Sequence, residues 1–80
     1  MVKLLYFAKV REAVGIEHEQ VELPKQIATV ADLADWLSTR HPIFNDRDRL
    51  RVAVDQAMAR FDADVRSATE IAFFPPVTGG

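Results

Sequence analysis

The chain has 80 residues, no cysteine, and a formal net charge of -2 from ten basic and twelve acidic side chains. This length allows one domain. The lack of cysteine excludes disulfides, thiolate nucleophiles and thiolate metal sites, so stability has to come from packing. The mixed, weakly acidic charge does not provide the basic surface that binding to phosphate backbones requires, and we expect no nucleic-acid partner.

The hydropathy pattern predicts neither a membrane segment nor an export signal. Residues 1–7 contain one lysine, but no long apolar run and no small-residue cleavage site. The longest apolar stretches fall far short of the roughly 20 residues that a membrane-spanning helix needs. We therefore expect a soluble, cytoplasmic protein with no membrane partner.

The first predicted element is a strand from Val2 to Val10. Its even positions are all apolar, as in a strand with one strongly buried face. Gly15 tolerates a positive φ, which predicts a turn within residues 11–16. Strand pattern returns towards residues 21–23. The two segments predict an N-terminal β-hairpin.

A helix is predicted to begin near Val30. Thr29 and Asp32 have the spacing of a capping box, in which two side chains bind amides at the helix start that would otherwise lack partners. Pro42 ends the helical pattern, and the charged residues 45–49 predict a solvated loop. The positions spaced as one apolar helix stripe are Val30, Leu33, Ala34 and Leu37.

The second half of the chain predicts a second hairpin and a last strand. Apolar residues alternate along residues 50–54, which predicts a strand. Asp55-Gln56 favours a turn, and residues 58–61 are predicted to form the returning strand of the hairpin. After a turn-rich connection over residues 62–69, the run 71–74 is apolar on both parities, which is typical of a strand in the middle of a sheet.

The predicted order of elements, ββαββ followed by a final strand, is the pattern of the β-grasp (ubiquitin-like) fold. It is an α+β fold, with a mixed sheet of about five strands and one main helix packed on one face. We expect the β-grasp domain to span residues 1–74 and an extended C-terminal tail to span residues 75–80.

The tail ends in Gly79-Gly80 and carries the candidate chemistry. Pro75 and Pro76 end the strand, because neither can donate a ladder hydrogen bond. Two of the three glycines of the chain occupy its last two positions, where they could thread a channel too narrow for side chains. The bland alternative is a frayed chain end.

A carboxylate is a poor acyl donor until it is activated, for example as an acyl-adenylate. Sulfur displacing AMP from such an adenylate gives a C-terminal thiocarboxylate, whereas attack by an amine gives an isopeptide bond. The residues alone leave both products open.

The run from Phe73 to Gly80 resembles the terminus of molybdopterin synthase small subunits, and residues 4–12 with Val14-Gly15 resemble the first strand and turn of that family. The resemblance implies that Gly80 is adenylated, becomes a thiocarboxylate (a C-terminal 1-thioglycine) and donates its sulfur to a pterin precursor in molybdenum cofactor biosynthesis. It also implies that partner grooves hold the segment before Gly80, which consists of Phe74, Pro75, Pro76, Val77, Thr78 and Gly79.

The implied partners are a large molybdopterin synthase subunit and an activating adenylyltransferase that uses ATP, in a hetero-oligomer with two carriers per dimer of large subunits. Catalytic residues would lie on the large subunit, so this chain is a sulfur-donor subunit that binds no cofactor or metal itself. The chain departs from the family pattern at two turns. Asp55 stands where asparagine is common, and residues 67–69 replace a turn that usually contains glycine.

Other candidate sites have plainer explanations. His18 and His41 have no second ligand at metal spacing, and the acidic pairs Asp46/Asp48 and Asp62/Asp64 suit a solvated face better than a calcium loop. Trp36 lies off the helix stripe, which favours partial packing against the loop that follows the helix over contact with a partner.

Phe73 and Phe74 must point to opposite faces of their strand, so only one can lie beneath the helix. The other is covered either by a loop or by a partner, and the family resemblance favours the partner.

Three alternatives to the leading hypothesis stay open. The first is a sulfur carrier for thiamine or thiolated-nucleoside synthesis, and the second is a ubiquitin-like protein modifier joined to lysines through Gly80. The third is a noncovalent binding module whose tail has no role. Only the third predicts that deleting Gly79 and Gly80 leaves function unchanged.

Overall fold

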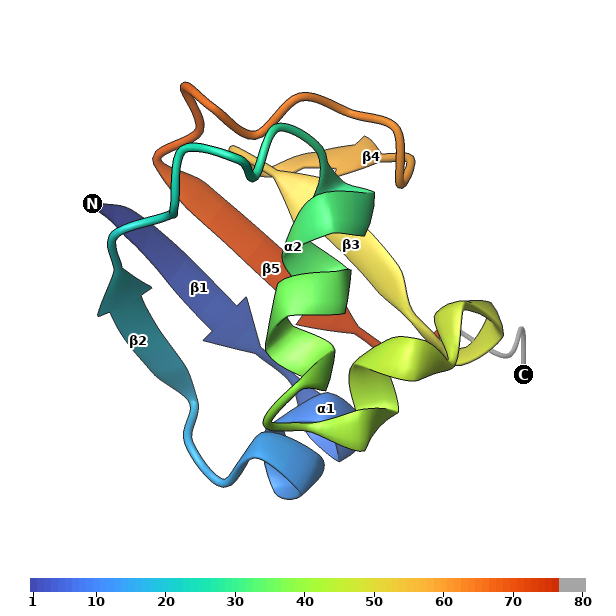
Figure 1. Cartoon of the computed structure of the whole chain (residues 1–80). Helices are drawn as coiled ribbons and strands as arrows, with labels where there is room; N and C mark the ends of the chain where they lie inside the picture. The colour runs from blue at the N-terminus through green and yellow to red at the C-terminus, as the bar shows by residue number, and fades with distance from the viewer. Residues whose placement is uncertain (77–80) are drawn as a thin grey trace.

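The computed structural model describes residues 1–76 of the chain (Figure 1). Its elements in chain order are β1 (Val2–Tyr6), α1 (Ala8–Val14), β2 (His18–Val21), α2 (Val30–Ser38), the 3-10 helices η1 (Pro42–Asn45) and η2 (Arg47–Arg49), β3 (Arg51–Val54), β4 (Ala57–Ala59) and β5 (Glu70–Phe74).

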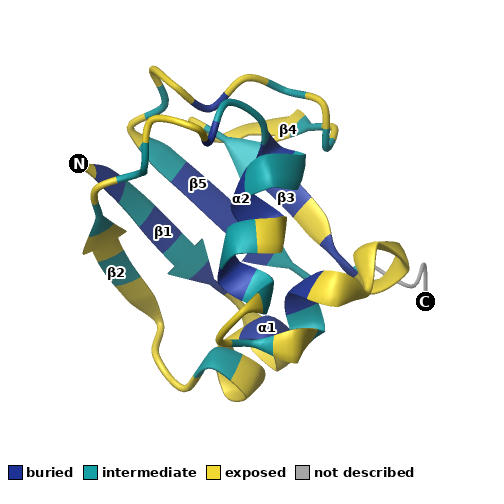
Figure 2. Cartoon of the chain, in the orientation of Figure 1, coloured by how far each residue is buried: buried dark blue, intermediate teal, exposed yellow. Residues whose placement is uncertain are grey.

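The strands form one mixed sheet in the order β2-β1-β5-β3-β4. The last strand, β5, lies at the centre, parallel to β1 and antiparallel to β3. Helix α2 crosses one face of the sheet (Figure 1). The buried residues concentrate in the central strands and in α2 (Figure 2). The predicted mixed sheet, with its central last strand and its single main helix, is confirmed.

The antiparallel pairing of the first two strands is confirmed, but the predicted hairpin turn and the predicted extent of the first strand are wrong. Strand β1 pairs with β2 in antiparallel register from Val2 opposite Val21 to Leu5 opposite His18. It ends at Tyr6, and α1 occupies the next segment, where Ala8 has a positive φ of 50°.

The prediction failed because an apolar residue at each even position does not by itself distinguish a strand from a short helix. Val10 is fully buried, but it reaches the core from α1, while Ala8 is exposed. Gly15, with a φ of 94°, caps α1 and donates its N–H to the Arg11 carbonyl, so it ends a helix instead of forming a hairpin turn.

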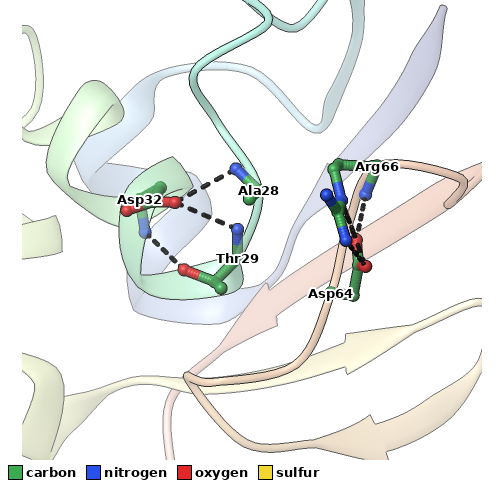
Figure 3. A network of polar contacts seen from close by, with 5 residues as sticks. All are labelled: Ala28, Thr29, Asp32, Asp64 and Arg66. Carbon is green, nitrogen blue, oxygen red and sulfur yellow. Dashed lines mark hydrogen bonds and ion pairs between the residues drawn. The ribbon is translucent and has the colours of Figure 1, made fainter.

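The start of α2 follows the predicted capping box. The Thr29 Oγ1 accepts a hydrogen bond of 3.2 Å from the Asp32 N–H, and the Asp32 carboxylate accepts the N–H groups of Ala28 and Thr29 at 3.0 and 3.2 Å (Figure 3). These amide donors, first from Ala28 and then from Thr29, lower the pKa of Asp32. The predicted stripe from Val30 to Leu37 is buried against the sheet, and α2 ends at Ser38.

The charged stretch that was predicted as a plain loop contains the end of η1 and all of η2. Phe44 of η1 is fully buried and packs edge-on against Tyr6 and Phe73, with ring centroids 6.2 and 5.1 Å apart. The Tyr6 hydroxyl donates to the Glu19 carboxylate at 2.8 Å. Burial, and then this hydrogen bond, raise the pKa of Tyr6. The aromatic cluster closes the end of the core that is nearest the tail.

Candidate functional site

The root of the tail is set by the central position of β5. This strand ends at Phe74, and the half-exposed Pro75 and Pro76 follow it. Phe74 lies opposite Arg51 at the start of β3, and the Phe7 N–H, just after β1, donates to the Phe73 carbonyl at 3.1 Å. The chain therefore leaves the sheet between its two central neighbours.

Of the predicted site residues, the structure describes Phe74, Pro75 and Pro76. The other four, Val77, Thr78, Gly79 and Gly80, lie outside the described residues.

The two phenylalanines at the end of β5 point to opposite faces, as predicted. Phe73 has no exposed surface and lies beneath α2 in the aromatic cluster. Phe74 faces the other side of the sheet and is half-buried. No helix of the described chain lies on this other face, which is therefore called the open face.

Apolar side chains gather on the open face around Phe74. One row of residues that pair in register crosses four strands: Leu5 with Ala72, Ala72 with Ala53, and Ala53 with Met58. Phe7 continues the alternation of β1, because its backbone is extended and the Tyr6 beside it points into the core.

Phe7 is 48% exposed and Met58 is 68% exposed. We call this set the open-face patch: Leu5, Phe7, Ala53, Met58, Ala72 and Phe74. Contiguous apolar surface of this kind marks an interaction site more often than a random surface does. Of these residues, sequence reasoning singled out only Phe74. Leu5 and Phe7 occupy alternate positions of the predicted first strand, opposite to its core-facing residues, and this pattern could have revealed the apolar side chains of the open face.

A groove of about 810 Å³ lies beside the tail root, between α1 and the η1–η2 segment. Its lining residues are Ala8, Lys9, Val10, Pro42, Ile43, Asp46, Arg49, Pro75 and Pro76. Arg49 and Asp46 form an exposed ion pair at 3.3 Å. The groove therefore has apolar walls, a charged rim and one side formed by the start of the tail.

The far end of β5 is held by Asp55. Asp55 and Gln56 have φ values of 49° and 71° in the predicted turn between β3 and β4. The Asp55 Oδ1 accepts three hydrogen bonds, from the Thr69 hydroxyl at 2.7 Å and from the N–H groups of Thr69 and Glu70 at 2.9 Å. These donors, the Thr69 hydroxyl foremost, lower the pKa of Asp55. The turn between β3 and β4 and the connection before β5 thus meet in one contact.

The residues that sequence analysis set aside have structural partners. His41 packs edge-on against Phe44 at 6.3 Å, and the Arg40 guanidinium lies 5.2 Å from the centre of the half-buried Trp36 ring. Among residues 1–76, no group of three or more potential ligand side chains could hold a metal ion. No helix in this part of the chain is long and apolar enough to cross a membrane.

The mixed sheet with a helix across one face, and with a tail root at the end of the central strand, defines an α+β domain of the β-grasp, ubiquitin-like class. A model of the ThiS family matches residues 4–80, and this chain belongs to that family.

The comparisons with individual proteins agree with this assignment. The chain is 39% identical to the molybdopterin synthase sulfur carrier subunit of Escherichia coli, over the full length of both. A putative molybdopterin converting factor subunit 1 from Pyrococcus furiosus has a similar structure, with a TM-score of 0.77 and 30% identity over 95% of this chain and 97% of that one. The small archaeal modifier protein 1 of Haloferax volcanii gives 0.74 and 27%, with the same two coverages of 95% and 97%.

Proposed function

We propose that this chain is the sulfur-carrier subunit of a molybdopterin synthase. The observation that carries the proposal is its end-to-end match, at 39% identity, to the Escherichia coli protein of that name. The proposal assigns to Gly80 the carboxylate that such a carrier needs.

In the proposed reaction, the Gly80 carboxylate attacks ATP on the activating partner and releases pyrophosphate, giving an acyl-adenylate. Hydrosulfide then displaces AMP and leaves a C-terminal thiocarboxylate. This chain contains no cysteine, so the sulfur has to come from another protein or a small donor. The thiocarboxylate sulfur then forms a bond to a pterin precursor on the large subunit, which supplies the catalytic residues, and water cleaves the bond from sulfur to Gly80 and restores the carboxylate.

The open-face patch supports a partner at the tail root. A chain that delivers its terminus into another protein has to bind that protein beside the tail, and exposed Phe7 and Met58 with half-buried Phe74 provide apolar surface at that place. Phe74, Pro75 and Pro76 would then set the direction in which residues 77–80 enter the partner. The assembly is a hetero-oligomer of this carrier with the large subunit, and the activating adenylyltransferase binds in turn.

Intact-protein mass spectrometry tests the proposal. The untagged chain is incubated with its activating enzyme, ATP and a sulfur source, under conditions that preserve thioacids. We expect a gain of about 16 Da at Gly80, the difference between sulfur and oxygen. A variant without Gly79 and Gly80 is the control and should stay unmodified. An unchanged mass of the full chain in the complete reaction would contradict the proposal.

One observation favours a second candidate, a protein modifier. The similar fold of an archaeal protein named as a modifier, with a TM-score of 0.74, shows that this architecture is also found in proteins with that name. In that case the activated Gly80 forms an isopeptide bond with a lysine amine. Adducts of this chain on lysines in extract of the native cell, lost when Gly80 is deleted, would favour the modifier over the carrier.

A further inference from the structure

Charge is unevenly distributed between the two ends of the domain. The end that carries the tail root, here the tail pole, includes α1, the segment from Thr39 to Arg49, and the start of β3. Its carboxylates Glu12, Glu17, Asp35, Asp46 and Asp48, of which Asp35 pairs with Arg47 at 3.0 Å, are outnumbered by one by basic side chains. These are Lys9, Arg11, Arg40, Arg47, Arg49 and Arg51.

The opposite pole has the reverse balance. It holds Lys3, Lys25 and Arg66, and these are outnumbered by acidic side chains. The acidic side chains are Glu22, Asp32, Asp55, Asp64 and Glu70. The tail pole therefore carries a small excess of positive charge in a chain whose net charge is -2.

The groove beside the tail root has two basic side chains and one carboxylate around apolar walls. Lys9 projects from α1 and Arg49 from η2, on the two sides of the groove, and Ile43 and Val10 line it. Within residues 1–76 Lys9 has no ion-pair partner, and Arg49 keeps 84% of its side-chain surface exposed despite its pair with Asp46. Pro75 and Pro76 form part of the same wall, so the groove continues directly into the tail root.

We propose that this groove is a second docking site, distinct from the open-face patch, for a partner segment that places an apolar side chain between flanking carboxylates. The segment would contact the carrier beside Pro75 and Pro76, away from the open-face patch. The inference rests on the proposed function, because it needs a protein that receives the tail. Electrostatic attraction of this kind raises association rates more than it slows dissociation.

Two matched lysine variants test the charge. Lys9→Glu in the groove and Lys25→Glu at the opposite pole both replace an exposed lysine and change the net charge equally. Association with the purified activating enzyme and with the large subunit is followed by stopped flow at about 0.05 and about 0.5 M salt. We expect Lys9→Glu to slow association with at least one partner about tenfold at low salt, and Lys25→Glu to slow it less than twofold. The difference should nearly vanish at high salt, because charges are then screened within a few ångströms.

A second pair of variants tests the apolar wall. Ile43→Ala should speed dissociation about fivefold, whereas Ile16→Ala, a truncation outside the groove, should leave it unchanged. Thermal unfolding of both variants checks that the fold is intact.

Equal rates for the two lysine variants with both partners would overturn the docking proposal. So would self-association of the wild type that Lys9→Glu abolishes without affecting partner binding, because the occupant would then be the acidic pole of a second copy. The mass measurement separates the two proposals. If the wild type gains sulfur and Lys9→Glu associates normally, only the docking proposal is contradicted. If the wild type neither binds a partner nor gains sulfur, the proposed function is contradicted as well.

Discussion

The two faces of the sheet differ in what covers them, although both are formed by the same strands. On the covered face, Tyr6 and Phe73 are enclosed by α2 and Phe44, and their apolar surface is removed from water by the chain itself. On the open face, Phe7, Met58 and Phe74 keep apolar surface exposed or half-exposed. Burial of the covered face stabilises the fold. The exposed apolar surface of the open face lowers solubility, and it contributes free energy only when a partner covers it. Substitutions on the covered face should therefore lower the free energy of unfolding, whereas substitutions on the open face should lower affinity for a partner.

The largest expected effect comes from Phe73 on the covered face. Phe73→Ala leaves a cavity beside Phe44 and should lower the free energy of unfolding by about 3–5 kcal/mol, measured by urea unfolding. This is a large part of the stability of a small domain. Phe74→Ala is the matched control one residue away, and we expect it to cost about 1 kcal/mol or less. Equal losses for the two would contradict the division of labour between the faces.

The open face should show the opposite behaviour. Met58→Asp places a charge in the open-face patch, where the side chain is 68% exposed. The free energy of unfolding should change by no more than about 0.5 kcal/mol, because the site is already in water. Affinity for the large subunit, measured by calorimetry, should fall at least about tenfold, because a carboxylate would be buried in an apolar contact.

The control for Met58→Asp is Gln56→Asp, in the exposed turn beside it. If both substitutions leave affinity unchanged, the partner does not cover this part of the sheet.

The elements specified by local signals could be predicted from the sequence. The capping box at Thr29 and the stripe from Val30 to Leu37 specified α2, and the doubly apolar run before Pro75 placed β5 at the centre. Helix α1 was missed because Val10 fits the alternating pattern of a strand, although in the structure it reaches the core from a helix.

Long-range contacts were beyond the sequence. Nothing near Asp55 indicates that its carboxylate binds Thr69, fourteen residues later. The groove beside the tail root likewise needs α1 and the η1–η2 segment to be adjacent, and no local pattern encodes that contact. The open-face patch was partly available, because Leu5 and Phe7 share a parity, but its extent depends on the strand order.

Helix α2 covers one face of the sheet, and its N-cap at Thr29 gives a prediction with a smaller expected effect. Thr29→Ala removes the hydroxyl that accepts the Asp32 N–H, and should lower the free energy of unfolding by about 1 kcal/mol. Thr29→Ser keeps the acceptor and should recover most of this loss. Thermal unfolding of the three proteins measures the effect. An equal loss for alanine and serine would assign the role of Thr29 to packing instead of capping.

The smallest expected effect is a pH dependence at the segment that meets the start of α2. Asp64, which bridges to Thr29, accepts hydrogen bonds from the Arg66 side chain and from the Arg66 N–H at 2.8 Å (Figure 3). These bonds, the side-chain ones foremost, lower the pKa of Asp64 from its ordinary 3.8 to about 2. Between these two values the unfolded chain binds more protons than the folded chain. The contribution of Asp64 to stability is therefore complete above about pH 4 and is lost as the pH falls towards 2.

Urea unfolding between pH 2 and 6 measures this dependence. Asp64→Asn cannot titrate, so its stability should fall less steeply than that of the wild type between about pH 4 and 2, and the two curves should converge at the acid end. Arg66→Gln removes the main donor and should flatten the curve in the same way. Asp62→Asn, two residues away, is the control for a general loss of negative charge. Parallel curves for Asp64→Asn and the wild type would mean that the ion pair does not form in solution.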